Sequence, residues 1–322
     1  MMRPTDAAVH GIHHVTAIAG DAQENLDFYT GVLGLRLVKK SINQDAPDTY
    51  HLFFADAVGT PGTDLTFFPW PKMGRAQPGA GMAGEVTFAV PTASLDFWQE
   101  RLAAHGVAVD PVETRFGEAV LPFADPHGLR LALVTTERER PFTAWAKSPV
   151  PAAHQLRGMD AVRMTVHRLG PTERLLTEAL GFEEAGEEAG WHRYRAGRDA
   201  AGTLLDVVER PDAPRGRWGT GGVHHVAWRV ADAEEEGAVR ARVARAGLQP
   251  TPFIDRFWFQ SVYFREPGGV LFELATDGPG FGRDEDVEHL GEALILPPWY
   301  EERRAEIEAG LPPLRAPHQQ EA

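Results

Sequence analysis

One short pattern occurs twice in this chain, far apart along the sequence. The segment GIHHVT spans residues 11–16, and GVHHVA spans residues 222–227. Both copies have a glycine, a β-branched residue and a doubled histidine in the same frame, and we interpret them as equivalent strands of repeated units. A repeat of this kind limits the fold to one that is assembled from similar modules.

Four such modules account for most of the chain. Each begins with a short apolar strand, continues with a helical stretch, and ends with two or three further strands. The opening strands are predicted at residues 11–20, 84–91, 158–167 and 221–230. The first helix has Asp21 as its expected N-cap. This order predicts an α+β fold, in which four βαβββ modules pair into two curved, barrel-like sheet domains with the helices outside.

Breaks in composition suggest where the domains end. The segment 137–155 is rich in proline and polar residues, so we predict it to be the joint between two halves. The predicted parts are an N-terminal domain of two modules at 1–137, a C-terminal domain of two modules at 156–290, and a helical tail at 291–322. The tail contains one proline-bounded amphipathic segment that we expect to pack on the body.

Composition narrows the kinds of partner. The chain has a net charge of −14 that is spread along its length, which argues against nucleic acid or an anionic membrane as a partner. It has no apolar run of about eighteen residues and no signal-type N-terminus, so we expect a cytoplasmic protein. Cysteine is absent. Any bound metal must therefore be held by histidine, aspartate or glutamate.

The doubled histidines and one glutamate are the best metal-ligand candidates. Alternate residues of a strand share a face, so each doublet offers one histidine to a given interior. Glu273 lies within the apolar segment VLFELA, where burial is costly unless the carboxylate is paired or binds a metal. The alternatives are a solvated Glu273 and hydrogen-bonded core histidines. Asp206 is the one comparable carboxylate in the other modules, so the sequence favours a single site, shared between the first and last modules.

These segments resemble a known family. The four modules, the segment 11–43 (GIHHVTAIAGDAQENLDFYTGVLGLRLVKKSIN), the segment 50–71 (YHLFFADAVGTPGTDLTFFPWP) and the LPPW motif at 296–299 are similar to the vicinal oxygen chelate superfamily. Within it they resemble ring-cleaving dioxygenases of the hydroquinone 1,2-dioxygenase type. The resemblance implies that a small aromatic substrate is opened with O2 at Fe(II), with Mn(II) as the alternative metal. It also implies that His14, His225 and Glu273 are the ligands, which form a facial triad.

The resemblance further implies a set of pocket residues. These are Arg256, Tyr263, His224, His13 and Thr16. Thr16 is expected on the same face of its strand as His14, whereas His13 and His224 face the site only if their strands are twisted or bulged. If residues 267–269 form a three-residue hairpin loop, Tyr263 lies directly opposite Glu273. A two- or four-residue loop would turn Tyr263 away from the site. The alternatives to pocket roles are a solvent-exposed Arg256 and a core Tyr263.

Other aromatic and histidine residues complete the predicted pocket. An apolar wall for a substrate ring is expected from Phe67, Phe257, Trp258 and Phe259. His51 is interpreted as a core histidine rather than a pocket residue.

Three rival functions remain at this stage. An extradiol dioxygenase acting on catechols would use the same triad. An isomerase or lyase of the glyoxalase kind would need a further carboxylate, and the first module has Phe67 where that ligand is expected. A binding protein of the same fold that holds an aromatic compound without turnover would lack the triad. For the assembly, we expect a homodimer or a higher homo-oligomer.

Overall fold

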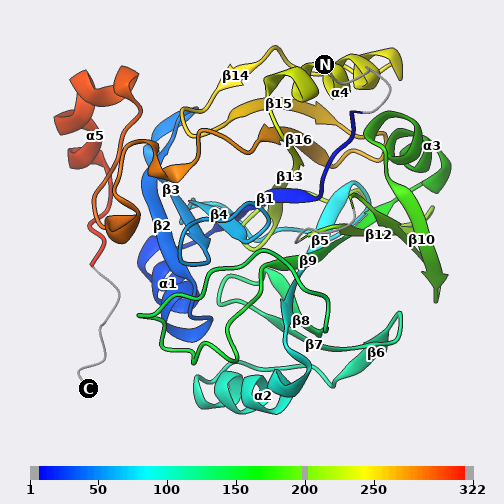
Figure 1. Cartoon of the computed structure of the whole chain (residues 1–322), viewed down its shortest axis with the longest axis horizontal. Helices are drawn as coiled ribbons and strands as arrows, with labels where there is room; N and C mark the ends of the chain where they lie inside the picture. Colours follow the sequence, from blue (N-terminus) through cyan, green and yellow to red (C-terminus); the bar gives the residue numbers. More distant parts are fainter. Residues whose placement is uncertain (1–6, 198–201, 316–322) are drawn as a thin grey trace.

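The computed structural model describes residues 7–197 and 202–315, and these residues form two curved sheets of eight strands each (Figure 1). The two strands at the middle of the first sheet, β13 and β1, are antiparallel to each other. The first sheet has the strand order β14 (Ile254–Asp255), β15 (Gln260–Arg265), β16 (Leu271–Thr276), β13 (Val223–Val230), β1 (Ile12–Ala19), β4 (Asp64–Pro69), β3 (Ala46–Ala55) and β2 (Arg36–Asn43).

The second sheet repeats this arrangement with the two central modules. Its middle strands, β9 and β5, are again antiparallel. Its order is β10 (Glu183–Glu188), β11 (Trp191–Arg195), β12 (Leu204–Glu209), β9 (Met159–Val166), β5 (Met82–Val90), β8 (Arg130–Thr135), β7 (Glu118–Ala124) and β6 (Glu113–Arg115).

Each sheet is built from two of the four modules. The first sheet joins the first module to the fourth, and the second sheet joins the second to the third. The opening strands of the first and fourth modules are more than two hundred residues apart in sequence, and those of the second and third modules about eighty. The α+β class, the βαβββ modules and the curved sheets are confirmed. The division at 1–137 and 156–290 stays a prediction.

The helices lie at the periphery, outside the sheets (Figure 1). Asp21 and Asp232 are equivalent N-caps, and each accepts a hydrogen bond from the backbone N–H three residues later, at 2.9 Å in both helices. Apolar residues of the helices and of the convex sheet faces share one core. The helices are α1 (Ala22–Asp27) with a π-helical turn at Phe28–Val32, α2 (Leu95–Ala104), α3 (Leu169–Arg174) with a π-helical turn at Leu175–Leu180, α4 (Ala233–Arg245) and α5 (Arg304–Gly310).

The concave interior of the first sheet has its own apolar cluster. Phe53, Trp258, Phe259 and Phe281 are among its buried residues, and they fill the space inside the curve of the sheet. Lys39 of β2 is fully enclosed here and is ion-paired with Asp284, at 2.8 Å, and with Glu285. These ion pairs fasten the segment after β16 to the opposite edge of the sheet, and this segment closes part of the interior.

The tail continues along the outside of the same sheet. Backbone bonds join Lys40 of β2 to Ile295, and the hydroxyl of Tyr300 donates to the carbonyl of Gln44 at 2.5 Å. The tail packs on the body as predicted. In the described part of the tail, the helical residues are a 3₁₀ turn at Pro298–Arg303 followed by α5. The helix is therefore shorter than the predicted helical tail at 291–322.

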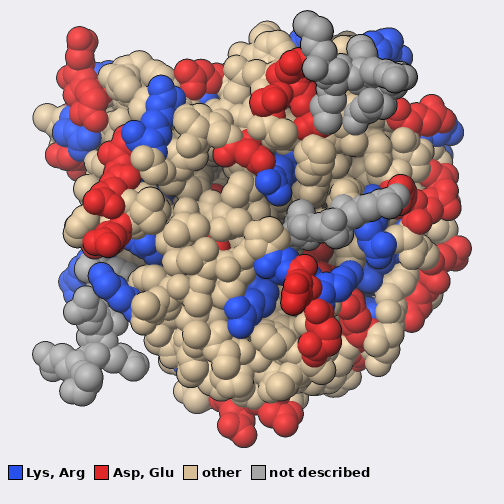
Figure 2. Space-filling model, viewed as in Figure 1, with Lys and Arg blue, Asp and Glu red and all other residues tan. Residues whose placement is uncertain are grey.

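Charges of both signs are mixed on the surface in view. Figure 2 shows acidic and basic side chains interspersed on the face in view, without a continuous basic patch. Among the residues described, no helix is long and apolar enough to cross a membrane.

Candidate metal centre and aromatic pocket

Three buried side chains from adjacent strands converge in the interior of the first sheet. His14 is on β1, His225 on β13 and Glu273 on β16. Nε2 of His14 lies 3.2 Å from Nε2 of His225. Oε2 of Glu273 lies 2.9 Å from Nε2 of His225 and 3.4 Å from Nε2 of His14. Among the described residues this is the one group of three such side chains whose ligand atoms meet within 4.8 Å.

The register of the strands explains the convergence. His14 is paired with Ala227, and Ala227 is paired with Glu273 on its other side, while His225 is opposite Thr16. The three side chains therefore form a compact triangle on one face. Burial is nearly complete, with exposed fractions of 1%, 4% and 0% for His14, His225 and Glu273.

The donor set fits a divalent metal ion. Oε2 of Glu273 is buried and accepts no hydrogen bond of good geometry from the described part of the chain, although two imidazole nitrogens face it. Lone pairs that converge in a dry interior repel one another unless a cation or a proton lies between them. Two imidazoles and one carboxylate are a common ligand set for non-haem iron and related ions, with positions left open.

Ser261 holds the other oxygen of the carboxylate. The hydroxyl of Ser261 donates to Oε1 of Glu273 at 2.6 Å, and Ser261 is itself fully buried on β15. This bond orients the carboxylate so that Oε2 faces the imidazoles. Ser261 was not among the predicted site residues, because a serine in a strand carries no signal until its neighbour across the strands is known.

Two β-bulges bring the first histidine of each doublet, His13 and His224, to the site beside the triad. The pairing of β1 and β13 skips one residue at His13 and one at His224. As a result Nδ1 of His13 lies 2.9 Å from Nδ1 of His14, and Nδ1 of His224 lies 2.8 Å from Nδ1 of His225. Strict alternation would have turned His13 and His224 away. An extra residue in one strand removes that restriction.

These contacts fix which nitrogen carries the proton. When Nε2 of His14 or His225 is a ligand, its Nδ1–H donates to Nδ1 of the neighbouring histidine. The neighbour then carries its own proton on Nε2. Burial, followed by the adjacent ligand histidine, lowers the pKa of both His13 and His224 to about 3. Both rings are therefore neutral near pH 7.

The three side chains of the triad also have the ionisation state that a metal ligand needs. Burial alone would raise the pKa of Glu273, but His14 and His225 hold it well below its ordinary value. Burial lowers the pKa of His225 despite its contact with Glu273. A charged carboxylate beside a neutral imidazole is the form that binds a divalent cation.

Tyr263 lies directly opposite Glu273, as the three-residue loop at 267–269 predicts. The Tyr263 ring meets the ring of His225 edge-on, with centroids 5.7 Å apart. Burial, followed by the charge of Glu273, raises the pKa of Tyr263 well above its ordinary value. Tyr263 is therefore a neutral hydrogen-bond donor at the wall of the site.

Arg256 joins the two edges of the curved sheet. Its guanidinium carbon lies 5.4 Å from the centroid of the Tyr263 ring, and Nη2 forms an ion pair with Asp45 at 2.8 Å. Burial opposes the charge of Arg256, but Tyr263 and Asp45 outweigh it and raise its pKa. The cation is therefore permanent and lies beside the tyrosine at the site, rather than free in solvent.

Thr16 faces the interior two residues after His14. Its hydroxyl lies 2.7 Å from the hydroxyl of Thr66 on β4, and that hydroxyl lies 2.8 Å from Nε2 of His51 on β3. Thr16 has the orientation predicted for it. The structure therefore adds Thr66 and His51 to the residues around the triad.

The aromatic wall is only partly the one predicted. Phe259 contacts the site, with its ring centroid 5.2 Å from the rings of both His13 and His14. Phe67 faces the opposite side of the sheet, where it packs on Tyr29 at 4.5 Å, so its placement in the wall is wrong. Phe257 and Trp258 pack on each other, with centroids 5.6 Å apart.

Three other aromatic residues surround His224 instead. The centroid of the His224 ring lies 4.4 Å from Trp218, 5.5 Å from Phe68 and 6.2 Å from Trp70. Trp218 is 37% exposed, so this cluster reaches the surface. Phe67 was predicted in the wall, but its neighbour Phe68 is the residue that lies there, so the prediction was wrong by one residue along the strand.

The same register corrects the comparison with glyoxalase-type sites. Thr66, not Phe67, takes the position in the first module that Glu273 takes in the fourth, because Thr66 is paired with Thr16 as Glu273 is paired with Ala227. Neither threonine nor phenylalanine supplies a second carboxylate. The argument against an isomerase of the glyoxalase kind therefore holds with the corrected residue.

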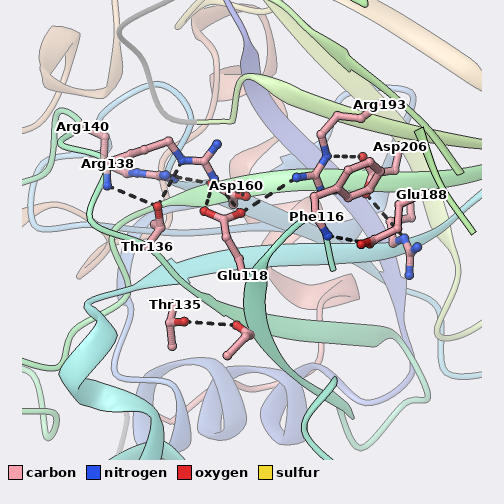
Figure 3. A network of polar contacts seen from close by, with 12 residues as sticks. Phe116, Glu118, Thr135, Thr136, Arg138, Arg140, Asp160, Glu188, Arg193 and Asp206 are labelled. Atoms are coloured by element: carbon pink, nitrogen blue, oxygen red, sulfur yellow. Dashed lines mark hydrogen bonds and ion pairs between the residues drawn. The ribbon is translucent and has the colours of Figure 1, made fainter. Parts of the chain in front are cut away.

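The second sheet has ion pairs where the first has the triad. Asp206 on β12 lies opposite Arg193, as Glu273 lies opposite Tyr263. Arg193 binds both oxygens of Asp206, at 2.7 and 2.9 Å, and Figure 3 shows this pair beside Glu118, Asp160 and Arg138. The carboxylate that could compete with Glu273 is therefore already neutralised by a guanidinium.

The fold and the site together define the class of protein. Residues 11–133 and 158–274 match the Glyoxalase/Bleomycin resistance protein/Dioxygenase superfamily, and the chain belongs to this superfamily. Glyoxalase I from Zea mays has the same fold, with a TM-score of 0.61 and 16% identity over 83% of this chain and 92% of that chain.

Nearer relatives identify the enzyme class within the superfamily. MhqA of Bacillus subtilis (strain 168), named provisionally as a ring-cleaving dioxygenase, is 44% identical over 95% of this chain and 99% of its own length. The chlorohydroquinone/hydroquinone 1,2-dioxygenase of Sphingobium indicum is 36% identical, with 93% and 95% of the two chains covered. A crystal structure from Bacillus subtilis, provisionally described as a dioxygenase, has a TM-score of 0.90 and 41% identity over 96% of this chain and 98% of that chain. The predicted enzyme class, a ring-cleaving dioxygenase, is confirmed.

Proposed function

We propose that this enzyme opens the ring of a hydroquinone-type substrate with O2, using Fe(II) bound by His14, His225 and Glu273, with Mn(II) as the alternative metal. The observation that carries the proposal is the buried triangle of two Nε2 atoms and Oε2 of Glu273, within 3.4 Å of one another. The relative named for chlorohydroquinone and hydroquinone supports the substrate class.

The ligand charges favour a phenolic oxygen at this centre. Two neutral imidazoles and one carboxylate leave one positive charge of a divalent ion uncompensated, and this charge attracts a phenolate. A bound Fe(II) would supply open positions for the substrate and O2, and would pass electron density from the ring to O2. The doubled histidines hold the ligand rings in one tautomer, so the geometry is set before the substrate enters.

The surrounding side chains bind the ring and its charge. The neutral hydroxyl of Tyr263 would donate a hydrogen bond to the substrate, and the permanent cation of Arg256 favours negative charge that develops on oxygen. Phe68 and Phe259 supply apolar contacts suited to an aromatic ring. The low pKa of His224 keeps its ring neutral near pH 7. The ring therefore carries a single proton, which can only move from one ring nitrogen to the other. The cytoplasmic location and the homo-oligomeric state stay predictions.

The test is oxygen consumption by protein loaded with Fe(II) under anaerobic conditions. We expect uptake of one O2 for each molecule of hydroquinone or chlorohydroquinone, and none from the same preparation of Glu273→Gln. Uptake with catechol and not with the hydroquinones would replace the proposal by the extradiol alternative. Absence of uptake with either class, in protein shown to contain iron, would contradict it.

A further inference from the structure

His51 is a histidine at the site that the proposed mechanism does not use. It lies on β3, half-buried, and is packed between Phe53 and Phe68, with centroid distances of 3.8 and 4.5 Å. Phe68 in turn contacts the ring of His224 at 5.5 Å. His51 therefore lies across Phe68 from the second doublet, on the wall of the interior formed by β3 and β4.

The environment of His51 connects it to the triad. Burial comes first among the effects that lower its pKa well below the ordinary value, and the charges of His14, His225 and Arg256 add to the shift, whereas Glu273 opposes it. Four groups of the site thus act on one ring electrostatically. A neutral imidazole near these groups can both donate and accept a hydrogen bond.

A chain of hydroxyls fixes one nitrogen of His51 and leaves the other available. Nε2 is bonded to Thr66, and Thr66 to Thr16, at 2.8 and 2.7 Å. Nδ1 makes no hydrogen bond to any residue that the structure describes. Rotation of the two hydroxyls reverses the direction of the chain, so Nδ1 can be either the acceptor or the donor. This is the property needed to bind a hydroxyl group, which is itself both donor and acceptor.

We infer that Nδ1 of His51 binds the ring hydroxyl that is not on the metal, and that this bond selects rings with a second hydroxyl over simple phenols. The inference rests on the proposed function, because the first hydroxyl is taken to lie at the triad. The ring would lie against Phe68, which contacts both His51 and His224. His51 is thereby a residue that determines specificity, and not the core histidine expected from the sequence.

The experiment measures binding rather than turnover. Affinities for hydroquinone and for phenol are determined by calorimetry on Fe(II)-loaded protein without O2, for the wild type, His51→Phe and His51→Gln. We expect the wild type to prefer hydroquinone by about tenfold, as one lost hydrogen bond to a buried partner implies. His51→Phe should reduce this preference to about twofold or less, and His51→Gln should keep most of it.

The matched control is His154→Phe. His154 also packs on a phenylalanine, at 4.2 Å from Phe97, and is bonded to the hydroxyl of Ser94 at 2.9 Å, but it lies away from the site. This variant should keep the full preference for hydroquinone. If His51→Phe does not fold, Thr66→Val tests the same hydroxyl chain and should also weaken the preference.

Two outcomes would overturn the inference, and they are distinguishable. If the wild type prefers hydroquinone and His51→Phe or Thr66→Val keeps that preference undiminished, the role of His51 is wrong while the proposed function remains. If the wild type binds hydroquinone no better than phenol, the hydroquinone assignment fails and the inference fails with it.

Discussion

Ser261 donates its hydroxyl hydrogen to Oε1 of Glu273 at 2.6 Å, which leaves Oε2 as the oxygen that faces the two imidazoles. One hydrogen bond thus gives the two oxygens of this buried carboxylate different roles: Oε1 is hydrogen-bonded to Ser261, and Oε2 is left to bind the metal. We expect the affinity of the site for the metal to depend on this hydrogen bond. Without it the Glu273 carboxylate could rotate, and metal binding would then have to restrict that rotation.

Replacement of Ser261 by alanine is expected to weaken metal binding by about tenfold or more. The measurement is a competition titration with a chelator of known affinity. Ser41→Ala is the matched control, because the Ser41 hydroxyl is equally buried but has no hydrogen-bond partner among the described residues. Equal affinities for the two variants would show that Ser261 does not orient Glu273.

Substitutions of His13 and His224, the histidines next to the triad histidines, are expected to differ in their effect on the free energy of unfolding. His13→Ala and His224→Ala should each weaken metal binding, since each removes the acceptor for a ligand Nδ1–H. His13 is 5% exposed and also bonds the backbone of Thr276, so His13→Ala should cost about 1 to 3 kcal/mol of unfolding free energy.

His224 is only half-buried and stacks on an exposed tryptophan, so His224→Ala should cost less than about 1 kcal/mol. Urea denaturation of the metal-free proteins gives both values, with His105→Ala at the exposed end of α2 as the reference. A larger loss for His224→Ala than for His13→Ala would contradict the assignment of His13 as the more firmly held ring.

Glu236 on α4 makes the stability depend on pH. It is fully buried, and neither oxygen has a partner in the part of the chain described. Burial, followed by the charge of Glu273, raises the pKa of Glu236 to about 8. The folded state thus holds a proton that the unfolded state loses near its ordinary pKa, and stability should fall as the pH rises from about 4.5 to 8.

The variant Glu236→Gln should flatten this pH dependence and raise the unfolding free energy at pH 8 by about 2 to 4 kcal/mol. The neighbour Glu235 is the contrasting control, because it accepts hydrogen bonds from the backbone N–H groups of Ala8 and Ala231. Glu235→Gln should destabilise at pH 8. Thermal or urea unfolding at pH 5 and pH 8 decides the sign for each variant.

Lys39 is expected to hold the segment that closes the interior of the first sheet. Lys39→Met leaves Asp284 and Glu285 without their cation and should cost about 3 kcal/mol or more. Lys40→Met is the control, because Nζ of Lys40 donates to one backbone carbonyl, that of Glu292, at 3.0 Å. The control should cost less than about 1 kcal/mol in urea denaturation. Similar losses for both would exclude a special role for the buried ion pairs.

The sequence was informative where a short-range rule fixed a position. The three-residue loop at 267–269 placed Tyr263 opposite Glu273, because pairing in a hairpin follows from its loop length. The doubled histidines and the carboxylate in an apolar strand identified three side chains that the structure brings together.

Long-range register could not be predicted in the same way. The pairing of the first module with the fourth is a tertiary choice, which no local pattern specifies. The bulges at His13 and His224 insert single residues that alternation does not anticipate. Phe67 was exchanged for Phe68 for the same reason, since the choice depends on which face of β4 turns toward the triad.

The position of the metal itself tests the account most directly. Crystals of the Fe(II)-loaded protein, measured with anomalous scattering at the iron edge, should show one strong peak within coordination distance of Nε2 of His14, Nε2 of His225 and Oε2 of Glu273. A peak at any other group of side chains, or an iron-containing protein whose triad holds none of the metal, would contradict it.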